Sequence, residues 1–130
     1  MARLEHVNVT VNDPDATAAV LVDLFGWRVR WAGKGMQTGR TVHVGDDDSY
    51  VALFSYGTTV ESAVESYRTR AGLNHIGVVV DDLDAVEIKV KNAGYTSENH
   101  ADYEPGRRFY FSEENGVEIE VISYAPGVVG

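Results

Sequence analysis

Apolar and polar residues alternate in two separate stretches of this chain. One stretch reads LEHVNVTV over residues 4–11, and the other reads LNHIGVVV over residues 73–80. Alternation with a period of two, in segments rich in Val and Ile, is typical of β-strands that bury one face. Residue 73 follows residue 4 at an offset of 69, and residues 42–56 match residues 110–124 at an offset of 68. Two nearly equal offsets indicate an internal duplication.

Each copy of the repeat continues through the same series of predicted elements. An acidic turn follows the first strand, and helices are predicted over residues 14–25 and 83–93. Asp and Pro favour the starts of these helices, and Gly26 and Gly94 favour their ends. Three strands are predicted after each helix, at residues 27–32, 40–44 and 50–56 in the first copy and 95–101, 107–112 and 117–124 in the second.

This order of elements predicts an α+β fold built from tandem βαβββ modules. The modules span residues 1–56 and 72–124, and a linker over residues 57–71 joins them. One module alone buries only one face of its sheet, so two modules are expected to form a curved, barrel-like mixed sheet with a shared concave face. A length of 130 residues suits a single domain made of both modules.

Composition narrows the classes of partner. The chain has 11 Lys and Arg residues against 20 Asp and Glu residues, a formal net charge of −9, which disfavours nucleic acid. No stretch approaches the ~20 apolar residues that cross a bilayer. The strand pattern begins at residue 4, which leaves no room for a signal peptide, and the chain has no cysteine. We therefore expect a cytoplasmic protein that binds a small molecule, with no nucleic-acid or membrane partner.

Three side chains are candidates for a metal site. His6 and His75 occupy equivalent positions of the two copies, so an approximate two-fold places them at matching points on the first strands. Glu120 lies between Ile119 and Val121, and a carboxylate within such an apolar strand is costly to bury without a cationic partner. A divalent metal ion held by His6, His75 and Glu120 supplies that partner. Glu118 is the alternative carboxylate.

Other polar residues have both a functional and a structural interpretation. His100 lies in a polar stretch and is a candidate acid–base group or a solvated loop residue. The run DYEPGRR over residues 102–108 is a charged hairpin or a flap over the cavity. In the flap, Arg107 or Arg108 pairs with a substrate carboxylate or phosphate, and Tyr103 lies nearby. Trp27 is a candidate for the cavity wall or for the core.

The motifs together resemble the vicinal oxygen chelate superfamily, which includes glyoxalase I, extradiol dioxygenases, methylmalonyl-CoA epimerase and the fosfomycin and bleomycin resistance proteins. The resemblance rests on LEHV at residue 4, LFGW at 24, NHIGVVV at 74, FYF at 109 and GVEIEV at 116, and it covers nearly the whole chain. The superfamily's metal ligands map to His6, Ala52, His75 and Glu120.

Ala52 departs from the four-ligand pattern of glyoxalase I and the epimerase, because a methyl group cannot bind a metal. The two histidines and one carboxylate that remain match the facial triad of the extradiol dioxygenases, which use Fe(II) or Mn(II). Those enzymes also have a Tyr ten residues before the last ligand, as Tyr110 precedes Glu120, which implies a catalytic role for Tyr110 alongside His100. Fe(II) or Mn(II) is therefore favoured, with Zn, Ni or Mg as alternatives.

The resemblance implies several functions. A metal-dependent enzyme that chelates its substrate through vicinal oxygens is favoured, with extradiol-type chemistry slightly preferred to that of a lyase or isomerase. A non-catalytic binding protein of the bleomycin-resistance type and a fosfomycin-type transferase are the alternatives. Members of the superfamily commonly pair, so a homodimer is expected.

Overall fold

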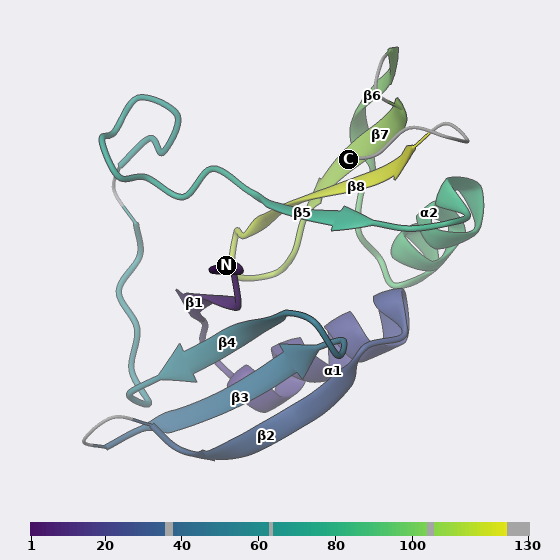
Figure 1. Ribbon diagram of the computed structural model, residues 1–130. Coiled ribbons are helices and arrows are strands. Elements are labelled where there is room, and N and C mark those ends of the chain that lie inside the picture. Colours follow the sequence, from purple (N-terminus) through teal and green to yellow (C-terminus); the bar gives the residue numbers. More distant parts are fainter. Residues whose placement is uncertain (36–37, 63, 104–105, 125–130) are drawn as a thin grey trace. The chain divides into compact units, whose positions relative to one another are not determined.

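The computed structural model describes residues 1–35, 38–62, 64–103 and 106–124 (Figure 1). The chain divides into two compact units, Met1–Ser62 and Ala63–Gly130, which correspond to the two copies of the repeat. Each unit has the order strand, helix and three strands. The elements of the first unit are β1 His6–Thr10, α1 Pro14–Phe25, β2 Arg28–Lys34, β3 Arg40–Gly45 and β4 Tyr50–Ser55. Those of the second are β5 Ile76–Val79, α2 Leu83–Asn92, β6 Glu98–Tyr103, β7 Gly106–Ser112 and β8 Glu118–Tyr124.

The predicted α+β fold with two βαβββ modules is confirmed, with the strands divided between two sheets. The described strands form two four-stranded sheets, ordered β1-β4-β3-β2 and β5-β8-β7-β6, and neither sheet closes into a barrel. In both sheets the first strand runs parallel to the last, and the other pairs are antiparallel. Each module therefore completes its own mixed sheet. That the two modules make one domain stays a prediction.

Both helices begin at the acidic turns seen in the sequence. Asp13 accepts a hydrogen bond from the backbone N–H of Ala16, and Asp82 accepts one from Ala85. These side chains satisfy amide groups that have no partner within the helix. Gly26 then ends α1 with a φ of 70°, a left-handed conformation that favours glycine. The helix bounds therefore match the predicted ones closely.

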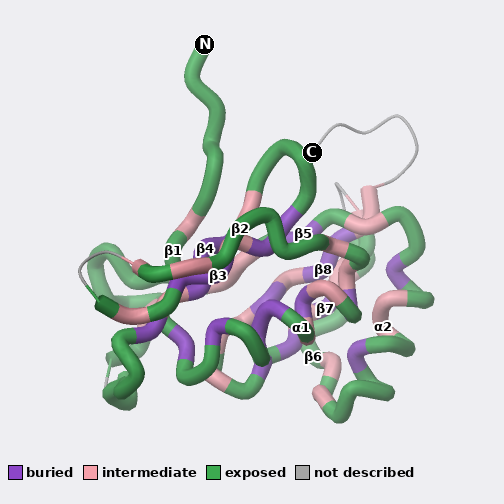
Figure 2. Tube along the Cα trace, turned by 90° about the horizontal axis from the view of Figure 1, so that it is seen from below, coloured by how far each residue is buried: buried purple, intermediate pink, exposed green. Residues whose placement is uncertain are grey.

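One face of each sheet packs against the helix of its own unit and forms the core (Figure 2). In the first unit, the buried core includes Leu24 of α1 and Val42 and Val44 of β3. In the second, Phe109 and Phe111 of β7 are fully buried. Alternate residues on the same strands point to the other side, which we call the open face. The open face holds the predicted site residues Tyr110 and Glu120.

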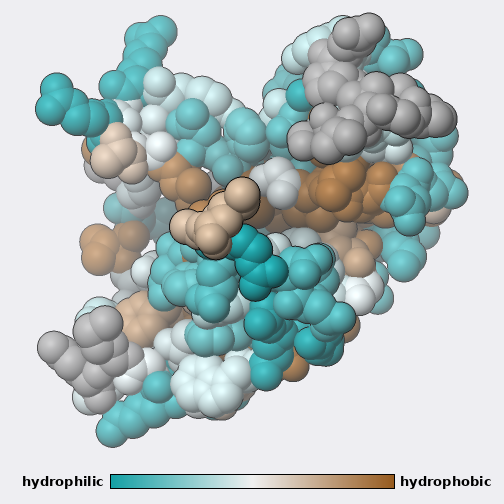
Figure 3. All heavy atoms as spheres, in the orientation of Figure 1, coloured by the Kyte–Doolittle hydropathy of each residue, from teal (hydrophilic) through white to brown (hydrophobic). Residues whose placement is uncertain are grey.

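The surface gives two further observations. In the view of Figure 3, hydrophobic residues gather over β5 and β8, where Val79 has 63% of its surface exposed. Among the described residues, no helix is long and apolar enough to cross a membrane.

Candidate metal centre

The open face of the second sheet brings three charged or polar side chains together. Tyr110 of β7 lies directly opposite Glu120 of β8, so their side chains project on the same side. Arg108 lies two residues before Tyr110 and shares that side. The register of one hairpin thus groups a cation, a phenol and a carboxylate.

Glu120 binds these two neighbours with one oxygen and faces His75 with the other. Its Oε2 accepts hydrogen bonds from Nη1 of Arg108 and from the hydroxyl of Tyr110, each 2.9 Å long. The side chains of Arg108 and Glu120 keep only 12% and 13% of their surface exposed, so this is a largely buried ion pair. Oε1 lies 3.4 Å from Nε2 of His75. The carboxylate therefore has its desolvated charge balanced by Arg108.

His75 faces Glu120 with one ring nitrogen and a second carboxylate with the other. Nδ1 lies 3.7 Å from Oε1 of Glu118 and 3.4 Å from the Tyr67 hydroxyl. That hydroxyl also donates a hydrogen bond to Glu118. Both ring nitrogens of His75 therefore face carboxylates, and Nε2 and Oε1 of Glu120 are each other's nearest charged neighbours. A metal ion bound by these two atoms would take the place of that contact.

The tyrosines of this cluster keep their protons at neutral pH. The hydrogen bond to the Glu118 carboxylate, together with burial, raises the pKa of Tyr67 to about 12. Burial and the hydrogen bond to Glu120 also raise the pKa of Tyr110 above its ordinary value. Both phenols are therefore donors to carboxylates rather than bases.

The first unit holds its own histidine in a similar way. Nδ1 of His6 lies 2.9 Å from Oε1 of Glu5, and that oxygen also accepts a 3.1 Å hydrogen bond from the hydroxyl of Tyr50. In both units, then, a tyrosine donates to a glutamate that faces Nδ1 of the histidine. The two tyrosines are not equivalent in the repeat. Position 50 corresponds to position 118, which is a glutamate in the second unit, whereas Tyr67 belongs to the linker.

His43 lies on the open face of the first sheet. The repeat alignment at an offset of 68 matches His43 with Phe111 and so predicts that it points away from the ligand-bearing side, which is wrong. His43 is directly opposite Ala52, and its ring stacks on Tyr50 at 4.4 Å. The ring of His6 lies 4.9 Å from that of Tyr50, and Trp31 lies 5.1 Å from His43. Burial and the nearby His6 lower the pKa of His43. The first unit thus presents a group of rings where the second presents charges.

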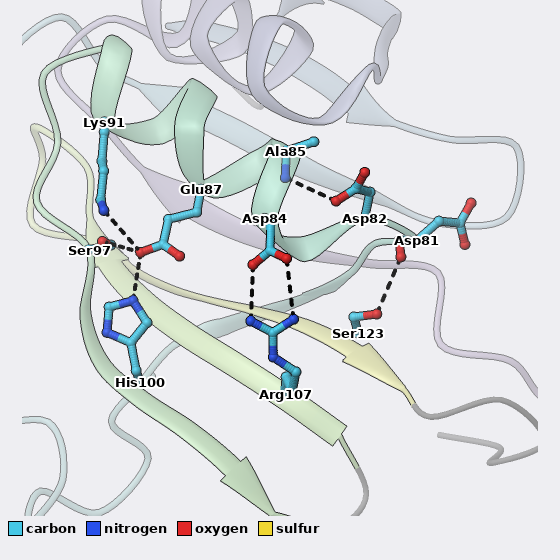
Figure 4. A network of polar contacts seen from close by, with 10 residues as sticks. All are labelled: Asp81, Asp82, Asp84, Ala85, Glu87, Lys91, Ser97, His100, Arg107 and Ser123. Carbon is cyan, nitrogen blue, oxygen red and sulfur yellow. Dashed lines mark hydrogen bonds and ion pairs between the residues drawn. The ribbon is translucent and has the colours of Figure 1, made fainter.

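Arg107 and His100 lie on the helix-facing side of the second sheet (Figure 4). Arg107 donates to both oxygens of Asp84 at the start of α2, at 3.0 and 3.4 Å. Nε2 of His100 lies 2.6 Å from Oε2 of Glu87, which also accepts a hydrogen bond from Ser97. The Ser97 bond, followed by the His100 bond, lowers the pKa of Glu87 against the effect of burial.

The remaining predicted residues have separate surroundings. The Tyr103 ring lies 4.8 Å from Cζ of Arg108, and 62% of the surface of Tyr103 is exposed. Trp27 precedes β2 in the first unit, and its ring lies 5.1 Å from that of Phe25. Of the predicted site residues, the second unit therefore gathers His75, Glu120, Tyr110, Arg108 and Tyr103, and it places Arg107 and His100 on the opposite face.

The model of the Glyoxalase/Bleomycin resistance protein/Dioxygenase superfamily matches residues 3–121. The chain belongs to this superfamily. No curated protein matches the sequence.

Three solved structures illustrate the likeness within the superfamily. A glyoxylase/bleomycin resistance protein/dioxygenase domain from Frankia sp. has a TM-score of 0.80 at 20% identity, with 98% of this chain and 96% of that chain covered. TnmS3, an antibiotic binding protein from a Streptomyces species, has a TM-score of 0.74 at 17% identity, covering 96% and 98%. The fosfomycin resistance protein FosX from Listeria monocytogenes, complexed with Mn(II) and sulfate, has 0.73 at 15%, covering 97% and 95%. At these identities the likeness shows the fold alone.

The donor atoms of the second unit fit two neighbouring positions around a metal. Bonds of about 2.0–2.2 Å at angles between those of an octahedron and a tetrahedron separate two ligand atoms by about 3.0–3.5 Å. Nε2 of His75 and Oε1 of Glu120 are 3.4 Å apart. No group of three His, Asp or Glu side chains able to hold a metal occurs among the described residues. His6 as the third ligand stays a prediction.

Two sets of contacts at the candidate site were not predicted from the sequence: those of Glu120 with Arg108 and Tyr110, and those of Tyr67. The pairing of Arg108 and Tyr110 with Glu120 could have been found from strand parity, because the turn that pairs Ser112 with Glu118 also pairs Tyr110 with Glu120. Tyr67 lies in the linker, whose sequence has no periodic pattern, so nothing in the sequence predicted its contacts with His75 and Glu118.

Proposed function

We propose that the protein is a metal-dependent enzyme of the superfamily that binds a small molecule through neighbouring oxygens. His75 and Glu120 hold a divalent metal, with Mn(II) or Fe(II) favoured, and His6 completes the predicted set. The single observation that supports this most is the adjacent pair of possible metal ligands, Nε2 of His75 and Oε1 of Glu120, 3.4 Å apart. When bound, the metal supplies Lewis-acid stabilisation of negative charge on substrate oxygen.

The surrounding residues prepare these donors. Glu118 and Tyr67 hold Nδ1 of His75, which fixes the ring and its tautomer. Arg108 and Tyr110 hold Oε2 of Glu120, which directs the other oxygen toward His75. Glu5 and Tyr50 do the same for His6. A carboxylate neutralised by Arg108 binds a metal less strongly, so the site suits a substrate that brings negative charge of its own.

The type of reaction depends on an acid–base residue. Extradiol-type chemistry was preferred with His100 in that role, but His100 is bonded to Glu87 on the opposite face from Glu120. Tyr110 is the candidate that remains within reach of Glu120, and its raised pKa makes it a hydrogen-bond donor. This arrangement removes the acid–base histidine that extradiol-type chemistry would use, and leaves the match to the facial triad as the reason for preferring an oxygen-dependent reaction. Oxygen uptake by the Fe(II)-loaded protein with catechols tests that branch directly.

Mn(II) binding by matched histidine variants tests the proposal. We expect His75→Ala to weaken Mn(II) binding at least ~100-fold, as loss of a ligand does, while His100→Ala leaves it unchanged. The same comparison in the first unit pairs His6→Ala with His43→Ala. Free Mn(II) is measured by electron paramagnetic resonance, and circular dichroism checks the fold. Equal binding by wild type and His75→Ala contradicts the proposed site.

A second candidate is a binding protein without chemistry, of the bleomycin-resistance type. The rings of His6, Tyr50, His43 and Trp31 on the first unit support it, because stacked aromatic surfaces bind planar ligands, and half of the Trp31 surface (50%) is exposed. Elemental analysis of the purified protein separates the two candidates, since a stoichiometric metal favours the enzyme. A homodimer is part of both proposals, and sedimentation equilibrium measures it.

A further inference from the structure

Arg108 uses only one of its three guanidinium nitrogens. Nη1 donates to Glu120 at 2.9 Å, while Nε and Nη2 are buried and have no hydrogen-bond partner among the described residues. Nε and Nη2 lie on the same edge of the guanidinium group and carry parallel N–H bonds. That edge fits the two oxygens of a carboxylate or of a phosphate group.

Two other arginines in the chain show what occupied edges look like. Arg40 uses Nε and Nη2 to bind both oxygens of Asp15, at 3.1 and 2.8 Å. Arg107 binds both oxygens of Asp84 through Nη1 and Nη2. Both of these pairs are on the exposed surface, where water also hydrates the guanidinium. Arg108 is more deeply buried than either one, yet its two-nitrogen edge is the one without a protein acceptor.

Leaving such an edge unused is energetically unfavourable. A buried donor without a partner costs about 1–3 kcal/mol, and more when it is charged. Native proteins rarely keep such groups without a structural or functional reason. The Tyr103 ring covers the guanidinium face at 4.8 Å, so the ring face and Glu120 are already in use and the edge is what remains.

We infer that the Nε–Nη2 edge of Arg108 binds an anionic group of the substrate, either a carboxylate or a phosphate or phosphonate. Nη1 stays bonded to Glu120, so the bound anion lies beside the proposed metal ligand. This inference deepens the proposed function by naming the substrate class, and it rests on that function only for the role of the anion as substrate. Anion binding itself requires no metal.

Titration of the metal-free protein with inorganic phosphate, and separately with acetate, tests the inference. The probe is the Nε–Hε signal of each arginine in a ¹⁵N NMR spectrum. We expect the Arg108 signal to shift and saturate, and the Arg40 signal to stay in place because Asp15 already occupies its Nε–Nη2 edge. The two titrations distinguish a phosphate-type group from a carboxylate. An unchanged Arg108 signal, or equal shifts at Arg108 and Arg40, overturns the inference.

Variants of the two adjacent arginines supply the control. Arg108→Lys keeps the charge and loses the two-nitrogen edge, so we expect phosphate or acetate affinity to fall at least ~10-fold. Arg107→Lys, on the other face of the strand, should leave the affinity unchanged. Calorimetry at low ionic strength measures both, and equal affinity of Arg108→Lys and wild type counts against the inference. Mn(II) binding is measured separately, so anion binding without Mn(II) binding defeats the metal proposal alone.

Discussion

The two units share one frame and differ on their open faces. In both, an arginine at the start of the third strand pairs with an aspartate in the first turn of the helix: Arg40 with Asp15, and Arg107 with Asp84. These equivalent pairs join sheet to helix on the packed side. The duplicated sequence has therefore kept the contacts that build a module.

The open faces have diverged at three paired positions of the third and fourth strands. Strand register makes Thr41 the counterpart of Arg108, His43 that of Tyr110, and Ala52 that of Glu120. The second unit thus buries a cation, a phenol and a carboxylate where the first has smaller or neutral groups. Only the histidines, each with a glutamate and a tyrosine at Nδ1, are common to both. Under the proposed function, most of the binding groups would therefore lie in the second unit.

The largest expected effect concerns the packed faces of the sheets, which the two units share, rather than the open faces, where they differ. Phe109 and its counterpart Val42 are buried, with 0% and 1% of their surface exposed. We expect Phe109→Ala to lower the free energy of unfolding by about 4 kcal/mol and Val42→Ala by about 2 kcal/mol, since each leaves a cavity in proportion to its volume. Urea unfolding measures both. A negligible effect at either position means that the two packed faces are not built alike.

The next effect isolates the buried ion pair of the second unit. Glu120→Ala leaves the Arg108 charge without its partner, and we expect a loss of about 3 kcal/mol in the free energy of unfolding. The double variant with Arg108→Ala should lose less than the sum of the single variants by at least about 1 kcal/mol. A complete urea-unfolding cycle measures this coupling. If the losses in the free energy of unfolding of the two single variants simply add, Arg108 and Glu120 do not stabilise each other.

A smaller effect makes the first unit resemble the second. Ala52→Glu introduces a carboxylate at the position equivalent to Glu120, on the open face of the first sheet. We expect Mn(II) to bind about tenfold more tightly, a gain of about 1.4 kcal/mol, because the site gains a ligand. Ala52 is only 2% exposed, so the larger side chain should also cost about 1–3 kcal/mol of stability. Ala52→Gln is the matched control, and equal affinity of both variants means that position 52 does not reach the metal.

The smallest effect concerns pH. The lowered pKa of His43, caused by burial and by His6, means that the unfolded chain takes up a proton more readily than the folded one. Stability should therefore be complete above pH 6.5 and decline as the pH falls through the lower folded pKa, by less than about 1 kcal/mol. We expect this decline in the free energy of unfolding to be absent from His43→Asn when urea unfolding is compared between pH 7.5 and 5.5. His100→Asn should retain it.

Local patterns predicted the elements well where the chain itself defines them. The first helix was expected over residues 14–25 and is observed at Pro14–Phe25, because its aspartate cap and following glycine are both local signals. The sixth strand was expected over residues 95–101 but begins at Glu98. Tyr95 instead packs on Phe111 and donates to Glu114, contacts that only the folded sheet provides.

Side-chain direction was harder to predict, since it depends on register. Gly45 pairs with Tyr50, while Ser112 pairs with Glu118, so the turn before the last strand is one residue longer in the second unit. The offset between the third strands is therefore 67 rather than 68. A shift of one residue moves a side chain to the other face of a sheet, which is why matching His43 with Phe111 at an offset of 68 predicts the wrong side for His43.

The hydrogen bond between Tyr67 and Glu118 also bears on how two chains could exchange modules. It anchors the end of the linker to the sheet that follows it, as the hydrogen bond between Thr59 and Asn12 anchors the start of the linker to the first unit. Residues 60–66 lie between these two anchors, and seven extended residues reach at most about 25 Å. Any exchanged pair must bridge its modules within that span.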